Sequence, residues 1–293
     1  MRQGVHPSYN FEALLTRTKP QPGELGRAKI NAVAVRNRLA LEFRIRRAMA
    51  IGSQVRGTAV RYYSDADYMY IFSRDDTRWG RATINSTTLL DNVRSLLIGR
   101  YPNTEIGRDG QAIVIGFAQG QRSMDIVPGW FDGFESRRPI YKIPDGAGEW
   151  IRTSPELHDS LFKTADLQAR GKLSRTIRLL KWWKYSRATP LPISSFYAEL
   201  VLSSLGTCVG VKSYSTCMYD SLLALHQRNG RALQDPAGIS GLIPMASTQA
   251  KLQQAREAIA SALDRAARAC DAERVRNHLE ANYQWNLLFN GEF

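Results

Sequence analysis

Residues 51–72 read IGSQVRGTAVRYYSDADYMYIF, and this stretch of the chain decides the fold. It predicts a strand ending near Ile51, a Gly-Ser turn, a basic loop and a second, apolar strand over residues 68–72. Side chains two residues apart in an extended strand face the same way, so Asp65 and Asp67 present both carboxylates on one side. The pattern therefore predicts a pair of anions where a buried strand begins.

A third carboxylate, Asp125, lies in the segment SMDIVP, which predicts another short strand. The chain between Asp67 and Asp125 is long enough for a helix and a hairpin, which can bring the two strands side by side. Carboxylates packed together repel, and a divalent cation such as Mg²⁺ removes that cost while it binds phosphate and water. Three carboxylates on adjacent strands suit two-metal catalysis, in which one ion holds a triphosphate and the other activates an attacking hydroxyl. We therefore expect Asp65, Asp67 and Asp125 to be catalytic and to bind two Mg²⁺ or Mn²⁺ ions.

The turn before the paired aspartates suits phosphate. Gly52 lets a phosphate approach the backbone, and Ser53 adds a hydroxyl donor where the strand turns into a helix. An isolated Asp-x-Asp is more often a solvated loop or strand edge than a functional site. Its combination here with a Gly-Ser turn, an apolar strand and the later Asp125 is far more specific, and it predicts a metal-bound triphosphate at this turn.

The composition excludes several classes of protein. The chain has 293 residues, a formal net charge of +13 and 43% hydrophobic residues, as expected of a folded protein of about two domains. No apolar run reaches the ~18 residues of a membrane span, and the first residues lack the apolar core of a signal peptide, so we expect a cytoplasmic protein without membrane attachment. Four scattered histidines and three cysteines lack metal-ligand spacing, which argues against zinc chemistry and a histidine-based triad. We interpret His158 as structural, because activation of a hydroxyl by a metal needs no imidazole.

Hydrophobic periodicity divides the chain into a mixed first part and a helical second part. The first part predicts one long helix over residues 24–47, several short strands and a helix near residues 88–99. From Ser154 onward the pattern is almost wholly helical, and PDGAGEW just before it supplies the Pro and Gly typical of a boundary. We predict the α+β class, with a mixed-sheet domain over residues 1–150 and a helical bundle domain over residues 151–293.

Two stretches carry the excess positive charge, because residues 1–47 and residues 163–187 each sum to +7. On a helix over residues 24–47, four basic side chains would share one face, namely Lys29, Arg36, Arg44 and Arg47. Such a stripe would suit a polyanion such as activating RNA or DNA. The alternative is a solvated helix face without a ligand, which is the more common role of such charges.

Several segments resemble one enzyme family, the bacterial cGAS/DncV-like nucleotidyltransferases (CD-NTases), which are relatives of cyclic GMP-AMP synthase and oligoadenylate synthase. GSQVRGTAVRYYSDAD is similar to the signature of the family, MDIVPGW resembles the strand that carries its third carboxylate, and RTIRLLKWWKY, ISSFYAEL and WNLLFNGEF also look family-like. The resemblance implies a polymerase-β-like core with a long spine helix. It also implies an enzyme that condenses nucleoside triphosphates into a cyclic di- or trinucleotide second messenger with release of pyrophosphate. Such enzymes serve bacterial anti-phage (CBASS) defence, in which a separate effector protein senses the product.

The resemblance assigns roles to three residues of the helical part. Lys181 aligns with the phosphate-binding lysine of the family, Ser195 with a residue that contacts phosphate or ribose, and Phe196 with an aromatic residue that stacks on a base. The residues alone instead favour a solvated lysine at position 181 and a core residue at Phe196. Tyr62 and Tyr63, beside the paired aspartates, either stack on a second nucleotide or pack into the core, and packing is the more common role.

Two other functions fit the same residues. A nucleotidyltransferase of this kind can instead extend or modify an RNA or protein acceptor, and an inactive relative can act as a nucleic-acid-binding module. All three carboxylates are present, which argues against the inactive alternative. Cyclic oligonucleotide synthesis is therefore the function that the sequence favours.

Overall fold

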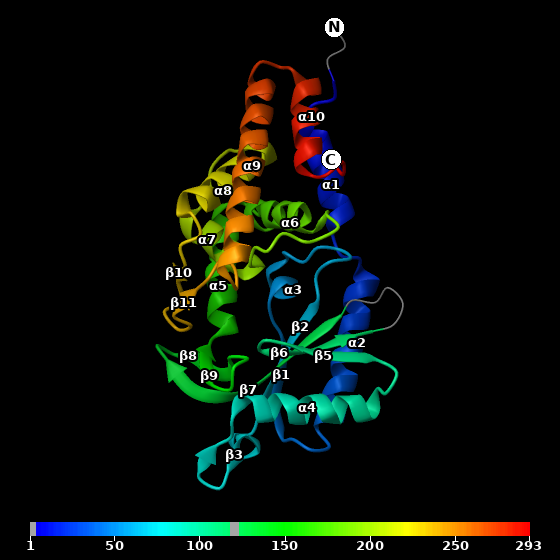
Figure 1. Ribbon diagram of the computed structural model, residues 1–293, viewed down its shortest axis with the longest axis vertical. Coiled ribbons are helices and arrows are strands. Elements are labelled where there is room, and N and C mark those ends of the chain that lie inside the picture. Colours follow the sequence, from blue (N-terminus) through cyan, green and yellow to red (C-terminus); the bar gives the residue numbers. More distant parts are fainter. Residues whose placement is uncertain (1–3, 118–122) are drawn as a thin grey trace. The chain divides into compact units, whose positions relative to one another are not determined.

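Figure 1 shows a computed structural model of the protein, which describes residues 4–117 and 123–293. The chain forms two compact units. The sheet unit comprises residues 20–159, and the helical unit comprises the residues up to Lys19 together with Ser160–Phe293. This division differs from the expected domains, residues 1–150 and 151–293, in the position of the boundary and in the placement of the first helix.

Helix α1 (Pro7–Thr18) belongs to the helical unit, although it precedes the sheet in the sequence. Phe11 is fully buried, and its ring contacts those of Trp285 and Phe293 at centroid distances of 5.1 Å and 4.7 Å. These contacts hold α1 against the last residues of the chain. Periodicity reports only which residues of a helix are apolar, so it gives no sign of this distant partner.

The sheet unit is built on a sheet of seven strands within the described ranges, with the main order β1-β2-β7-β6-β5 and with β8 and β9 continuing from β7. The strands are β1 Ile45–Ala50, β2 Ala66–Phe72, β5 Glu105–Asp109, β6 Ala112–Gly116, β7 Met124–Glu135, β8 Arg138–Pro144 and β9 Trp150–Thr153. β2 and β7 pair in parallel, and the other pairs of this sheet are antiparallel. The mixed sheet, followed by a helical region, confirms the predicted α+β class.

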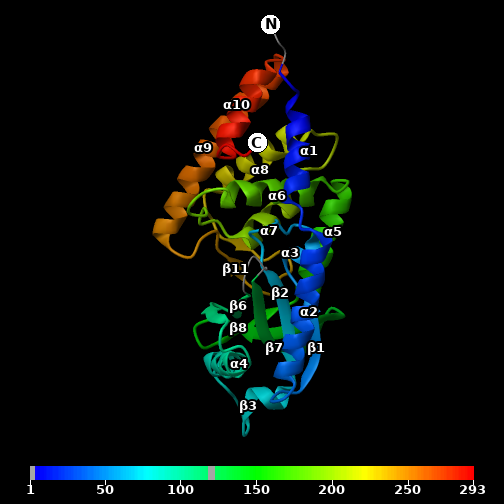
Figure 2. The same ribbon diagram turned by 90° about the vertical axis from the view of Figure 1, so that its right-hand side faces the viewer.

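Helices α2 (Pro22–Leu39) and α4 (Ser86–Arg100) pack against one face of this sheet (Figure 2). Tyr70 of β2 lies in the core that they form, and its hydroxyl donates to Ala32 O at 2.9 Å. Met69, the preceding residue of β2, belongs to a smaller core on the other face. This alternation fixes the register of β2, because a slip of one residue would turn Tyr70 out of the larger core.

The predicted long helix over residues 24–47 is wrong in its last part. α2 ends at Leu39, and strand β1 begins at Ile45. The ring of Phe43 stacks on that of Phe72 at 4.7 Å, and β1 pairs with β2, so the sheet draws this segment out of the helix. Tertiary packing has overridden the helical pattern.

The predicted basic stripe is therefore wrong as one face of a single helix. Lys29 and Arg36 lie on α2, but Arg44 lies between α2 and β1, and Arg47 lies within β1. The guanidinium of Arg47 is also paired with Glu156, with Nη1 and Oε1 2.6 Å apart. The charges that the sequence assigned to one helix face belong to α2, to the segment that follows it and to β1.

Two small elements flank β2. The short helix α3 (Ser53–Arg56) lies between β1 and β2, and the 3₁₀ helix η1 (Arg74–Thr77) follows β2. A hairpin of β3 (Arg78–Trp79) and β4 (Ala82–Thr83) continues from η1. α3 thus precedes the start of β2, whereas the hairpin lies beyond its other end (Figure 1).

The helical unit contains most of the helices predicted from residue 154 onward. They are α5 Pro155–Gln168, whose first turn is in the sheet unit, α6 Lys172–Tyr185, α7 Ser195–Leu205, α8 Tyr214–Arg228, α9 Gln249–Arg274 and α10 His278–Leu288, with a small hairpin of β10 Leu233–Gln234 and β11 Leu242–Ile243. Within the described ranges, no helix combines the length and the apolar character that a membrane crossing requires.

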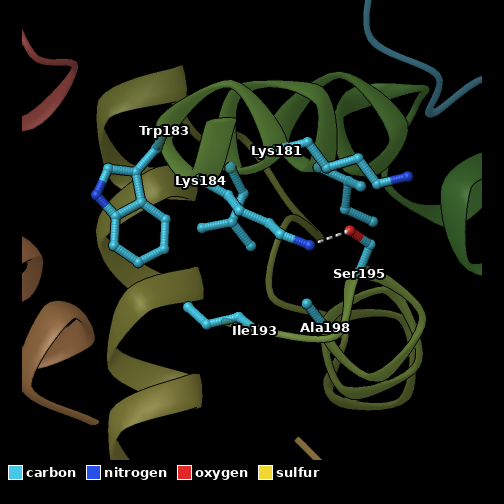
Figure 3. Close-up of a pocket in the computed structure, with 8 residues that line it drawn as sticks. Lys181, Trp183, Lys184, Ile193, Ser195 and Ala198 are labelled. Carbon is cyan, nitrogen blue, oxygen red and sulfur yellow. Dashed lines mark hydrogen bonds between the residues drawn. The ribbon is translucent and has the colours of Figure 1, made fainter. Parts of the chain in front are cut away.

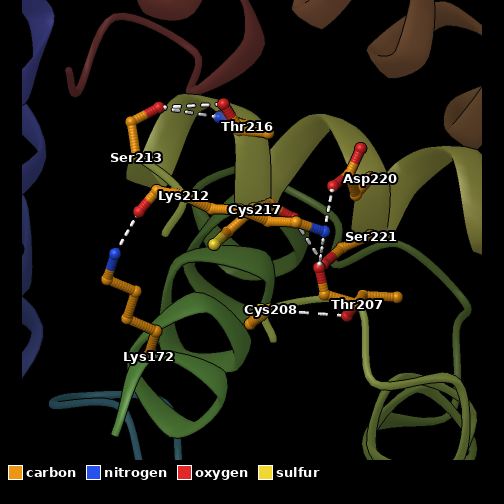
Figure 4. A network of polar contacts seen from close by, with 9 residues as sticks. All are labelled: Lys172, Thr207, Cys208, Lys212, Ser213, Thr216, Cys217, Asp220 and Ser221. Carbon is orange, nitrogen blue, oxygen red and sulfur yellow. Dashed lines mark hydrogen bonds and ion pairs between the residues drawn. The ribbon is translucent and has the colours of Figure 1, made fainter. Parts of the chain in front are cut away.

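A polar network holds the loop between α7 and α8 (Figure 4). Lys212 Nζ donates to Thr207 O and pairs with Asp220 Oδ2, each at 2.8 Å. The ammonium of Lys172, at the start of α6, donates to Lys212 O. These contacts tie the loop to α6 and α8 and so fix the start of α8.

Candidate active site

The three predicted catalytic carboxylates meet at the beginning of two parallel strands. Asp65 directly precedes β2, Asp67 is the second residue of β2, and Asp125 is the second residue of β7. Asp67 and Asp125 are direct partners in the parallel register. Ala66 N donates to Ser123 O at 2.9 Å, which extends this pairing to the residues just before the carboxylates.

A serine that sequence reasoning missed orients one of these carboxylates. The hydroxyl of Ser123 donates to Asp65 Oδ1. Ser123 lies two residues before Asp125, so strand alternation directs both side chains to the same face. This spacing is the signal by which the sequence could have identified Ser123.

The carboxyl group of Asp125 is in an environment that disfavours its ionised form. Burial, together with the nearby charges of Asp65 and Asp67, raises the pKa of its carboxyl group to about 7. Its Oδ1 atom is buried and has no hydrogen-bond partner among the described residues. An ionised Asp125 therefore needs a positive charge next to it.

These features fit divalent cations. The ligand atoms are carboxylate oxygens, which Mg²⁺ and Mn²⁺ prefer, and a cation would satisfy the orphaned oxygen of Asp125. No three Asp, Glu, His or Cys side chains within residues 4–117 and 123–293 form a ready-made metal cage.

Gly52 lies against Asp67. Its φ is +69°, and a β-carbon on this residue would overlap Asp67 Oδ2 and lie 3.1 Å from Asp67 Cγ. Ile51 N also donates to Asp67 O at 3.0 Å, which anchors the turn to β2. Ser53 follows as the first residue of α3 and is buried. The predicted Gly-Ser turn therefore adjoins the paired aspartates, and glycine is required there by both conformation and space.

The basic residues around this turn are engaged within the protein. Arg56 Nη1 lies 2.8 Å from Asp159 Oδ1, and both side chains are about nine-tenths buried. Arg61 Nε lies 3.1 Å from Glu24 Oε1. These arginines brace the turn, so the charge that they offer to a ligand is smaller than the sequence suggests. His158, next to Asp159, is buried, as the structural interpretation requires.

Lys181 in the helical unit is neither solvated nor isolated. Its Nζ atom lies 2.6 Å from Glu199 Oε1, and the two side chains are only 7% and 2% exposed. Both residues face the packed side of their helices, α6 and α7. The ion pair connects α6 to α7 beside Ser195, the first residue of α7.

A second lysine, which sequence reasoning did not select, reaches the same serine. Lys184 Nζ donates to Ser195 Oγ at 3.3 Å, at a pocket that also contains Lys181 (Figure 3). Burial lowers the pKa of Lys184 to about 8. Lys184 lies three residues after Lys181 on α6, so helical periodicity was the available signal.

Phe196 is half-buried and so is not an ordinary core residue.

The two tyrosines beside the aspartates are not core residues. Tyr62 is 70% exposed and Tyr63 is 38% exposed. The packing role that the sequence favoured is therefore wrong for Tyr62. Its φ is +71°, in the left-handed region that residues other than glycine rarely adopt.

Comparison with known proteins gives a family match. Residues 6–165 match the family model described as the Second Messenger Oligonucleotide or Dinucleotide Synthetase domain. A probable cyclic nucleotide synthase of Bacillus cereus (strain VD146) is 24% identical over 276 residues, covering 84% of this chain and 81% of the relative. The cyclic AMP-AMP-AMP synthase of Escherichia coli (strain MS 115-1) is 26% identical over 170 residues, covering 56% of this chain and 51% of the relative.

Solved structures share the fold. E. coli MS115-1 CdnC with ATP superposes with a TM-score of 0.71 at 19% identity, covering 99% of both chains. CdnC is also known in a complex with a HORMA protein, with the same TM-score. Vibrio cholerae DncV cyclic AMP-GMP synthase with nonhydrolysable GTP gives a TM-score of 0.63 at 15% identity, covering 84% of this chain and 68% of the relative.

Proposed function

The chain belongs to the family of second messenger oligonucleotide or dinucleotide synthetases, the CD-NTases, and we propose that it joins nucleoside triphosphates at Asp65, Asp67 and Asp125. It is a cyclic nucleotide synthase, a nucleotidyltransferase that produces a cyclic oligonucleotide second messenger. Its family typically uses divalent metals.

The observation that carries the assignment is the parallel pairing of Asp67 with Asp125. It gathers three carboxylates at one point and leaves Asp125 Oδ1 buried without a partner. Such an arrangement is costly for a carboxyl group that only stabilises the fold, because its charge is desolvated and repelled. The cost is understandable in a site that receives cations together with a triphosphate.

Asp65, Asp67 and Asp125 would hold two Mg²⁺ or Mn²⁺ ions. When bound, such ions stabilise the charge on the triphosphate and the leaving pyrophosphate and lower the pKa of the attacking hydroxyl. Asp125 would hold an ion in its ionised form, and the ion would supply the positive charge that its buried carboxylate needs. The Ser123 hydroxyl keeps Asp65 oriented throughout.

Gly52 and Ser53 would bind the donor triphosphate. The absence of a side chain at Gly52 lets phosphate oxygens approach the backbone beside Asp67, and Ser53 adds a hydroxyl. In each condensation, the ribose hydroxyl oxygen of one nucleotide attacks the α-phosphorus of another, and the bond to pyrophosphate breaks. A final intramolecular attack of the same kind closes the ring.

Ser195, Lys181 and Phe196 would bind nucleotide in the helical unit. Ser195 would contact phosphate, and Lys181, held by Glu199, would place its positive charge at the same end of α7. Lys184 extends this set, since it already donates to Ser195. Phe196, half-buried at the start of α7, would stack on a base.

The product would be a cyclic di- or trinucleotide that a separate effector protein senses in anti-phage (CBASS) defence. The name of the E. coli relative, cyclic AMP-AMP-AMP synthase, supports a product of this class. CdnC is known in a complex with a HORMA protein, and this chain would likewise bind a partner protein. Activating RNA or DNA on α2 is not favoured, because the four basic residues do not lie on one helix.

Incubation with labelled nucleoside triphosphates and Mg²⁺ or Mn²⁺, followed by phosphatase, tests the proposal. A cyclic product has no terminal phosphate, so it keeps its label, and mass spectrometry then gives its ring size and bases. Asp67→Asn should form no product and remain folded. Linear, phosphatase-sensitive products would contradict ring closure, and label transferred to RNA or protein would favour the acceptor-modifying alternative.

A further inference from the structure

Tyr62 presents a large aromatic ring to solvent at the tip of a turn that does not favour it. The residue has φ +71° and a side chain that is 70% exposed. A glycine or asparagine would adopt this conformation at lower cost. Neither packing nor backbone geometry therefore explains a tyrosine here, and strained residues of this kind concentrate at functional sites.

The turn that carries Tyr62 is well defined. Val60 N donates to Ser64 Oγ at 2.8 Å, and Ser64 N donates to Val60 O at 3.0 Å. Val60 itself is fully buried, so it anchors the turn to the protein. These bonds fix the backbone on both sides of Tyr62 and hold the strained conformation in place.

Arg61 supports one side of the ring. Its guanidinium carbon lies 4.6 Å from the centroid of the Tyr62 ring, and its Nε atom is 3.1 Å from Glu24 Oε1. The other oxygen of Glu24 accepts a hydrogen bond from Gln21 N at the start of α2. The ring is thus backed by a cation that is itself tied to a helix, which restrains its orientation before any ligand binds.

Tyr62 is close to the catalytic carboxylates along the chain. It is three positions before Asp65, so their α-carbons are at most about 11 Å apart. A nucleotide whose phosphates or hydroxyl reach Asp65, Asp67 and Asp125 carries its base within the neighbourhood of this turn. An exposed, restrained aromatic ring backed by a guanidinium is the type of surface on which bases stack.

We propose that Tyr62 is a base-stacking residue for a nucleoside triphosphate substrate, held in position by Arg61. The inference rests on the proposed function and adds a residue to it. Because every base has a flat face, the contact would contribute to affinity for all substrates and would not select one base.

The test compares Tyr62→Gly, which removes the ring and suits the positive φ, with Tyr62→Phe, which keeps the ring. Tyr9→Ala is the control, since Tyr9 is equally exposed at 70% but lies on α1 of the helical unit. We expect Tyr62→Gly to raise KM for the nucleoside triphosphates about 5- to 100-fold with kcat nearly unchanged. Tyr62→Phe and Tyr9→Ala should resemble the wild type.

A second measurement separates stacking from a structural role. Ribose 5′-triphosphate has no base, so its inhibition constant should be the same for the wild type and Tyr62→Gly, and the variant should be at least as stable to heat. An unchanged KM in Tyr62→Gly, or an equal loss of affinity for ribose 5′-triphosphate, would overturn the proposal. If the wild type forms no product at all, the proposed function fails, and equilibrium binding of ATP and ribose 5′-triphosphate to the same variants still decides the role of Tyr62.

Discussion

Gly52 and Asp67 are in such close contact that a β-carbon on residue 52 would overlap the carboxylate oxygen Oδ2 of Asp67. The relationship joins the Gly-Ser turn, which would bind the triphosphate, to a carboxylate that would bind metal. A substitution at either residue should therefore shift the position of the other.

Gly52→Ala should lower kcat about 100-fold, because the new methyl group displaces the Asp67 carboxylate and misplaced catalytic groups lose about this much. Gly57→Ala is the matched control. Gly57 has φ +70°, but a β-carbon there meets nothing within 4 Å. Both variants should lose about 1–2 kcal/mol of stability from the strained φ, measured by urea unfolding. If the two variants are equally active, the contact with Asp67 does not matter.

Asp125→Asn should abolish product formation and yet stabilise the metal-free protein at pH 8 by on the order of 1–3 kcal/mol. The pKa of Asp125 is raised from its ordinary value of 3.8 to about 7, so the folded state retains a proton that the unfolded state has lost. The wild type therefore loses stability as the pH rises from about 4 through 7, and the variant is spared that loss.

Urea unfolding in EDTA at pH 5 and pH 8 measures the effect. At pH 5 the protonated wild type and the asparagine variant should be similar, and at pH 8 they should differ. Mg²⁺ with ATP should raise the stability of the wild type at pH 8 far more than that of Asp125→Asn. Identical pH dependence in the two proteins would contradict the electrostatic origin.

Lys181→Met should lose about 3–5 kcal/mol of stability, because it leaves the buried carboxylate of Glu199 without its partner. The double variant Lys181→Met with Glu199→Leu removes both charges and should recover most of the stability.

The same double variant separates the two roles of Lys181. If Lys181 also contacts the triphosphate, the double variant will be folded but will keep a raised KM for ATP. A wild-type KM in the double variant would show that the lysine only holds α6 to α7. Thermal unfolding and steady-state kinetics on the same preparations give both quantities.

The carboxylates could be predicted from sequence because their signal is local. Strand alternation places Asp65 and Asp67 on one side, and the Gly-Ser turn precedes them at a short distance. The register that sets Asp67 beside Asp125 depends on how β2 pairs with a strand far along the chain, so it had to be observed. The same holds for the hydrogen bond from Ser123 to Asp65.

Distant contacts also explain where the prediction failed. Residues 40–47 continue the helical pattern of the sequence. In the structure, however, the ring of Phe43 stacks on that of Phe72, and β1 pairs with β2 in the sheet. On α6, periodicity brings Lys181 and Lys184 to neighbouring positions without showing their partners. Lys181 forms an ion pair with Glu199, and Lys184 donates a hydrogen bond to Ser195.

Lys184 should make substrate affinity sensitive to pH above neutrality. Burial lowers its pKa from 10.5 to about 8, so its positive charge is lost over a range in which an exposed lysine keeps it. If Lys184 contacts phosphate through its place beside Ser195, KM for ATP should rise about tenfold between pH 7 and pH 9 as a charged hydrogen bond disappears. Lys184→Arg stays protonated throughout, so its KM should be nearly constant.

Lys184→Met completes the comparison. It should show a raised KM already at pH 7 with little further change to pH 9. The folded pKa of Lys184 lies below that of the unfolded chain, so the charged form costs stability at neutral pH, and stability recovers as the pH rises from about 8 to 10.5. Lys184→Met should therefore be more stable than the wild type at pH 7, by on the order of 1–3 kcal/mol. Parallel KM profiles for the wild type and Lys184→Arg would assign the pH effect to another group.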